Sequence, residues 1–190
     1  MVIRTIRTLV SMTRLIPYQN RIAVVQALGR TLGISCFALG KIFRSHWLCV
    51  LGLPSVAEHS FRHRRFDEAS AKALQLLQFA EAKPNDWNYG NAVHKAHLVL
   101  GRVALARGDL ETAGAELLAS ARVPGSPQLA SFGPNMQLAL ELLQADRKDI
   151  VLEYFSLCDK FWETGEAQLR SWSSDIENGR LPSFGGNLLY

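Results

Sequence analysis

LGRVALARGDLETAGAELL, residues 100–118, is the stretch that decides the fold. It reads as two short amphipathic helices separated by a tight turn at Gly108-Asp109. Small residues stand where the two helices would face each other, namely Gly101 and Ala104 in the first and Ala113 in the second. Antiparallel helices approach closely only where the facing side chains lack bulk, so this spacing predicts a tightly packed helical hairpin.

The interval inside this hairpin recurs on both sides of it. Gly101 and Ala113 are twelve residues apart, and the same separation recurs in the pairs Ala57/Ala69 and Ala139/Val151. We therefore expect one helix pair over residues 55–84, one around residues 100–118 and one over residues 134–164. A last helix from Glu166 to about Glu177 carries an apolar stripe that would cover the exposed end of the stack, formed by Leu169, Trp172 and Ile176.

The central hairpin resembles one tetratricopeptide (TPR) repeat, whose signature has Leu-Gly, then a small or aromatic residue, then Ala at these intervals. The resemblance implies an all-α fold with about three TPR-like antiparallel helix pairs in a short solenoid, ended by a C-terminal capping helix. Residues 86–190 also resemble a family of uncharacterised bacterial TPR-like proteins, through DWNYGNAVHKAH, LGRVALARGDLETA, PGSPQLASFGPNM, VLEYFSLCDKFW and FGGNLLY. No activity comes with this resemblance, and members of that family lack a counterpart of residues 1–50.

Charge is distributed unevenly along the 190 residues, although the net charge is only +4. Residues 1–65 hold ten Lys or Arg against the single acid Glu58, whereas residues 66–190 hold eleven bases and sixteen acids. This asymmetry indicates different surroundings for the two parts. We divide the chain into a basic, apolar N-terminal segment, residues 1–50, and a TPR-like helical-repeat domain, residues 51–190.

Three interpretations of residues 1–50 remain open: an extension native to the fold, a membrane anchor, and a start codon assigned too early. Charged residues interrupt the apolar runs, so none reaches the length of about 18 residues expected of a membrane-spanning helix. Arg with Ser and Thr but no acids is also typical of a transit peptide or of a helix lying on an anionic membrane. Three cysteines without a CxxC pair indicate free thiols in a reducing compartment. We expect a cytoplasmic protein, with membrane contact through residues 1–50 as the alternative.

The expected function is non-catalytic: an interaction module that holds a peptide or protein segment in the concave groove of the stack. In the TPR register the groove would be mostly apolar with two bases, lined by Lys95, Leu98, Arg102, Leu105 and Ala106 of the central repeat and by Met136, Leu140 and Leu143 of the third. The Lys/Asn arrangement of chaperone-tail-binding TPR domains is absent, because Leu98 and Arg102 occupy its two defining positions in the central repeat. Lys95 and Arg102 would recruit a partner with apolar anchors and a carboxylate.

An alternative is a small polar pocket for a metabolite or a metal, built from aromatic, amide and imidazole groups around the start of the central helix. Its candidate residues are Trp87, Asn88, Asn91, His94, Phe132 and Asn135. His94 and His97 are three residues apart and share a helix face, but a zinc site usually needs a third ligand at a defined spacing. We therefore expect no metal and no cofactor, with histidines that brace loops or the core.

Catalytic and nucleic-acid motifs are weak or absent. The chain has no nucleophile elbow, no HExxH and no phosphate-binding glycine loop followed by Lys-Ser/Thr, so we expect no enzyme activity. The basic run over residues 59–65, HSFRHRR, is short and adjoins an acidic domain. We interpret it as a solvated turn and expect no nucleic-acid partner.

One short motif occurs twice outside the repeats. SFGPNM at residues 131–136 is echoed by SFGGNL at residues 183–188. In each copy we expect Phe to anchor in an apolar pocket, Gly to allow a close backbone approach, and Asn to bond neighbouring backbone.

Overall fold

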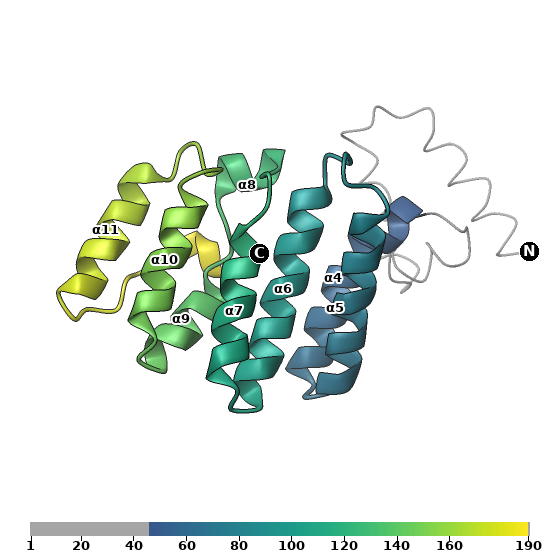
Figure 1. Ribbon diagram of the computed structural model, residues 1–190, viewed down its shortest axis with the longest axis horizontal. Coiled ribbons are helices and arrows are strands. Elements are labelled where there is room, and N and C mark those ends of the chain that lie inside the picture. Colours follow the sequence, from purple (N-terminus) through teal and green to yellow (C-terminus); the bar gives the residue numbers. More distant parts are fainter. Residues whose placement is uncertain (1–45, 190) are drawn as a thin grey trace, which may run out of the picture.

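The computed structural model describes residues 46–189, and within that range every regular element is helical. The predictions made for residues 1–45 lie outside this range. Figure 1 shows the longer helices running side by side across the molecule, with α4 and α5 at one end and α11 at the other, and the short helix α8 above α7. The helices are α4 (His46–Arg62), α5 (Phe66–Glu81), α6 (Tyr89–Ala106), α7 (Leu110–Ala121), α8 (Pro127–Phe132), α9 (Gln137–Gln144), α10 (Lys148–Cys158) and α11 (Glu166–Glu177), and a 3-10 turn, η2 (Gly185–Leu188), ends the range.

Neighbouring helices pack as the twelve-residue interval predicts. Helix α4 packs on α5, α6 on α7, and α9 on α10, while α5 and α6 join the first pair to the second. All members of the three residue pairs that define the interval are buried: Ala57 and Ala69, Gly101 and Ala113, Ala139 and Val151. The all-helical prediction is therefore confirmed within the described range.

Close packing at the central pair depends on Gly101. A Cβ atom at this position would overlap the side chain of Leu138 on α9 and would lie 3.1 Å from Cβ of Glu116 on α7. Ala104 and Ala113 are buried in the same region. The small residues predicted to lie at the helix contact do so, and Gly101 brings α9 against the hairpin as well.

Two elements depart from the sequence expectation. Helix α4 begins at His46 and runs through Pro54, so the first helix starts nine residues before the predicted Ser55. Helix α8 follows Val123 in a stretch predicted to be a loop; the Ser126 hydroxyl accepts a hydrogen bond from the Leu129 amide, and Pro127 occupies the first turn. Because α8 and the loop after it use residues up to 136, α9 begins at Gln137 rather than near Pro134.

The core is divided into two clusters of unlike composition. The cluster between α4, α5 and α6 is rich in alanine and valine, whereas the cluster from α6 to α11 contains the aromatic residues Tyr154, Phe155, Trp162, Trp172 and Phe184. Helix α11 matches its predicted range, and its stripe of Leu169, Trp172 and Ile176 is buried against the second cluster. After α11 the chain turns back along the row, and η2 returns to its centre (Figure 1).

Candidate functional site

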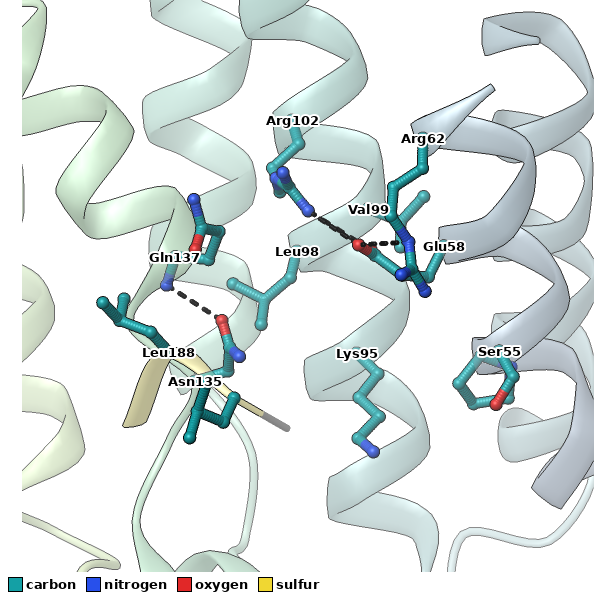
Figure 2. Close-up of a pocket in the computed structure, with 12 residues that line it drawn as sticks. Ser55, Glu58, Arg62, Lys95, Leu98, Val99, Arg102, Asn135, Gln137 and Leu188 are labelled. Atoms are coloured by element: carbon teal, nitrogen blue, oxygen red, sulfur yellow. Dashed lines mark hydrogen bonds and ion pairs between the residues drawn. The ribbon is translucent and has the colours of Figure 1, made fainter. Parts of the chain in front are cut away.

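An open groove of about 570 Å³ lies between α4, α6, the loop before α9 and the stretch that follows η2. Figure 2 shows its lining side chains, which come from segments far apart in the sequence. The lining is Pro54, Ser55, Glu58 and Arg62 from α4, Lys95, Leu98, Val99 and Arg102 from α6, and Asn135, Gln137, Leu188 and Leu189 from the C-terminal half. We call this cavity the groove.

Lys95 differs from the other charged residues of the groove because no charged group within residues 46–189 pairs with it. Its side chain points away from the Arg102–Glu58 pair (Figure 2), and within residues 46–189 its ammonium group makes no ion pair or hydrogen bond. Burial lowers the pKa of Lys95 below its usual value, because removing the ammonium group from water disfavours its charged form. A half-buried cation without a counter-ion is suited to pairing with an incoming carboxylate.

Arg102 also lines the groove, but its charge is already balanced. Its Nε donates to both Glu141 carboxylate oxygens at 3.0 and 3.1 Å, and its Nη1 donates to Glu58 Oε1 at 3.0 Å. The guanidinium also lies 4.3 Å from the centre of the Phe61 ring. The expectation that Arg102 recruits a carboxylate is therefore wrong, because two glutamates of this chain, from α4 and α9, hold it.

Three other predicted groove residues belong to the core instead. Met136 is fully buried, and Leu105 and Leu140 are half-buried against the second core cluster. The reason lies in the loop before α9, where the Met136 amide donates to the Asn187 carbonyl at 2.8 Å. The bond fixes the backbone at residue 136, and the Met136 side chain there is fully buried in the second core cluster. Ala106 is exposed at the end of α6 and Leu143 is half-buried in α9, and neither lines the groove.

Asn88 and Asn91 of the alternative pocket bond to each other and to α8, whereas Asn135 lines the groove. Asn91 Nδ2 donates to Asn88 Oδ1 at 2.9 Å and to Gln128 Oε1 at 2.6 Å, while Asn91 Oδ1 accepts from the Ser126 hydroxyl at 2.9 Å. These bonds fasten the start of α6 to α8. The side-chain amide of Asn91 is therefore already bonded within the chain.

His94 joins three segments at the centre of the molecule. Its Nε2 accepts from the Asn135 amide at 3.2 Å, so the proton resides on Nδ1, which donates to the Ser120 carbonyl at 2.9 Å. Burial lowers the pKa of His94 to about 4, since the charged form is excluded from water. Both ring nitrogens are thus engaged, and His94 ties α6 to the end of α7 and to the loop before α9.

Nothing among the described residues resembles a metal site. His97 bonds Glu116 through Nδ1 at 2.6 Å, separately from the bonds of His94, and no group of three or more His, Cys, Asp or Glu gathers within residues 46–189. Of the other two candidates for the alternative pocket, Trp87 is half-buried and Phe132 is 67% exposed. The structure brings together Asn88 with Asn91 and His94 with Asn135.

Sequence reasoning missed the α4 wall of the groove. Ser55, Glu58 and Arg62 share one face of α4, at spacings of three and four residues, and all three line the groove. One signal was present: Glu58 is the only acid in the first 65 residues, and such an isolated charge often has a specific partner, here Arg102. No sequence pattern indicated that Leu188 and Leu189 would line the groove, because their position depends on how the chain returns after α11.

Two further observations concern membrane-spanning helices and similarity to known proteins. None of the helices within residues 46–189 is both long enough and apolar enough to cross a bilayer. No family model matches this sequence, and comparisons with curated proteins and with solved structures also give no match.

Proposed function

We propose that this protein is a non-catalytic interaction module that binds a peptide or protein segment in the groove. The observation that carries the proposal is the pairing of an open, partly apolar groove of about 570 Å³ with the ammonium group of Lys95, which has no counter-ion among residues 46–189. A cavity of this size exceeds what one or two side chains fill, and it opens to solvent along α4 and α6. A segment of several residues suits it.

The lining indicates which chemistry the segment carries. Pro54, Leu98, Val99 and Leu188 offer apolar surface, and Lys95 offers one positive charge. Arg102 is already paired with Glu58 and Glu141, and Arg62 also contacts Glu58, so Lys95 is the lining cation that pairs with the carboxylate of the partner. The partner therefore presents an acidic residue together with apolar side chains.

A TPR-like arrangement is consistent with this use of the groove. The first helices of the three pairs, α4, α6 and α9, are neighbours, and α4 and α6 supply most of the lining. In a TPR-like stack the first helices face the concave side, where extended or helical segments dock. The proposal of a TPR-like solenoid rests on this packing and on the twelve-residue interval.

A groove-blocking variant tests the function directly. Ser55 is exposed on α4 and lines the groove, so Ser55→Trp should fill the groove without disturbing the core. A random peptide library displayed on phage is selected on the full chain, and the selected peptides are synthesised with capped ends. Fluorescence anisotropy should show affinity falling at least tenfold, about 1.4 kcal/mol, in the Ser55→Trp variant.

The matched control is Ser171→Trp, which places the same bulk at an exposed serine of α11 away from the groove. Selected peptides should bind this control with wild-type affinity. A second variant, Lys95→Glu, should weaken the same peptides by roughly tenfold at low salt and by less at high salt. Selection that yields only peptides indifferent to Ser55→Trp would refute the proposed function.

A further inference from the structure

Exposed large apolar side chains gather on two segments that touch. Of the four such side chains within residues 46–189, Phe132, Leu181 and Leu189 lie at the end of α8 or in the stretch after α11, and only Leu74 lies elsewhere, on α5. Isolated exposed apolar residues are ordinary on protein surfaces, but Phe132 and Leu189 stand on two backbone segments that are hydrogen-bonded to each other through Asn187.

The two segments are held rigidly against each other by Asn187. Its Nδ2 donates to the carbonyls of Phe132 at 3.1 Å and Pro134 at 2.9 Å, and its own carbonyl accepts from the Met136 amide at 2.8 Å. Asn187 is itself buried. Because these bonds fix the backbone on both sides, side chains displayed there are already positioned for a partner, which lowers the entropy cost of binding.

The segments that Asn187 joins extend into the groove. Leu189 is 85% exposed and belongs to the groove lining, together with Leu188 and Asn135. Phe132 is 67% exposed and lies three residues before Asn135. Leu189 therefore stands in the groove lining, and the Phe132 carbonyl is bonded by Asn187, two residues before Leu189. We call Phe132 and Leu189 the apolar rim.

We propose that the apolar rim is a second contact for the segment that the groove binds. A bulky apolar side chain of the partner packs on Phe132 and Leu189 while a carboxylate of the same segment pairs with Lys95. The occupant is thus a protein segment with an acidic residue and a separate aliphatic or aromatic anchor. This inference rests on the proposed function, and charge complementarity at Lys95 together with continuity between rim and groove selects the occupant.

The test uses the full chain and the capped synthetic peptides selected on the groove. The double variant Phe132→Ser/Leu189→Ser should bind them about tenfold more weakly, since it removes two apolar surfaces that the complex would bury. Its melting temperature should match the wild type, because both side chains are exposed in the free protein. The control Leu74→Ser removes another exposed leucine that does not line the groove, and it should bind as the wild type does.

A peptide variant completes a double-mutant cycle. Replacing the bulky apolar residue of a selected peptide by Ser should weaken its binding to the wild-type chain and have little further effect on the double variant. Wild-type affinity in the double variant, while Ser55→Trp still abolishes binding, would overturn the apolar rim and leave the proposed function standing. Peptide binding that is insensitive to Ser55→Trp would overturn both.

Discussion

The loops at residues 131–136 and 183–188 share the pattern Ser-Phe-Gly-x-Asn, yet they place their phenylalanines oppositely. Phe184 is 2% exposed and meets Trp172 edge-on, with the ring centres 4.9 Å apart, whereas Phe132 is 67% exposed. The expectation that both rings anchor in apolar pockets is therefore right for Phe184 and wrong for Phe132. A local motif sets how the backbone turns, but the surrounding helices decide which side chain is buried.

The surroundings explain the difference. Helices α10 and α11 leave an aromatic slot between Phe155 and Trp172, and Phe184 fills it. At the other loop the indole of Trp162 lies directly against Gly133, where a Cβ atom would overlap the ring. Trp162 thus covers the backbone of the first loop, and the Phe132 ring remains outside.

Truncation of Phe184 and of Phe132 to alanine should give the largest difference in stability between the two loops. Phe184→Ala removes a buried ring that closes the aromatic slot, so we expect a loss of about 3–5 kcal/mol in the free energy of unfolding. Phe132→Ala removes an exposed ring and should change stability by no more than about 0.5 kcal/mol. Urea unfolding of both variants measures the difference, and equal losses would mean that the two loops are equivalent.

Alanine substitutions at Gly133 and Gly185 should show a second difference in stability between the two loops. Gly133 has φ +79° and abuts Trp162, so Gly133→Ala adds a steric overlap to a strained backbone and should cost about 2–4 kcal/mol. Gly185 has φ +52°, and a Cβ atom added there would meet nothing within 4 Å, so Gly185→Ala should cost only about 1 kcal/mol. Thermal melts followed by circular dichroism would rank them, and a larger loss at Gly185 would contradict the comparison.

Only the first loop should respond to acid, because only its Asn135 amide is held by His94. The pKa of His94 is lowered to about 4, so the unfolded chain binds a proton there at a higher pH than the folded chain does. The contribution of this group to stability is complete above about pH 6.5 and is lost as pH falls toward 4, by up to about 3 kcal/mol. Urea unfolding between pH 7 and 4.5 should show a shallower decline in His94→Gln than in the wild type, and parallel declines would refute this assignment.

The two loop asparagines should give the smallest contrast. Asn187→Ala leaves the carbonyls of Phe132 and Pro134 without their side-chain donor, and we expect a loss of about 1–2 kcal/mol. Asn135 is half-buried, and its Oδ1 accepts from the Gln137 amide within the same turn, so Asn135→Ala should cost about 0.5–1 kcal/mol. Hydrogen exchange of the Met136 amide, which bonds Asn187, should accelerate in Asn187→Ala. A larger loss at Asn135 would reverse the ranking.

Periodic features of the chain could be predicted without the structure. The interval of twelve residues located the three pairs, because small residues at facing positions are required wherever two helices approach closely. The apolar stripe of α11 could also be predicted, since the spacing of Leu169, Trp172 and Ile176 places them on one helix face. These are local properties, and each is set by residues within one or two turns of one another.

The groove could be predicted only in part. Lys95 and Leu98 line it, whereas Met136 is fully buried in the second core cluster, where its amide bonds Asn187, 51 residues away in sequence. Arg102 lies in the groove, but its partners Glu58 and Glu141 come from two other helices. Periodicity shows which face of a helix a residue occupies, but not what a distant segment places opposite it.

The sequence by itself determined the three helix pairs, their pairing interval, the small residues at their contacts and the range of α11, but not α8 or the start of α4. The predicted features follow from spacing along one or two helices. Only the tertiary structure decided that Arg102 pairs with Glu58 and Glu141, that Lys95 has no ion-pair partner within residues 46–189, and that Phe132 stays exposed while Phe184 is buried. The physical reason is that charge pairing and burial depend on distances between segments. Glu58 on α4 and Glu141 on α9 meet Arg102 on α6, and the stretch after α11 bonds the loop before α9, only in the folded chain.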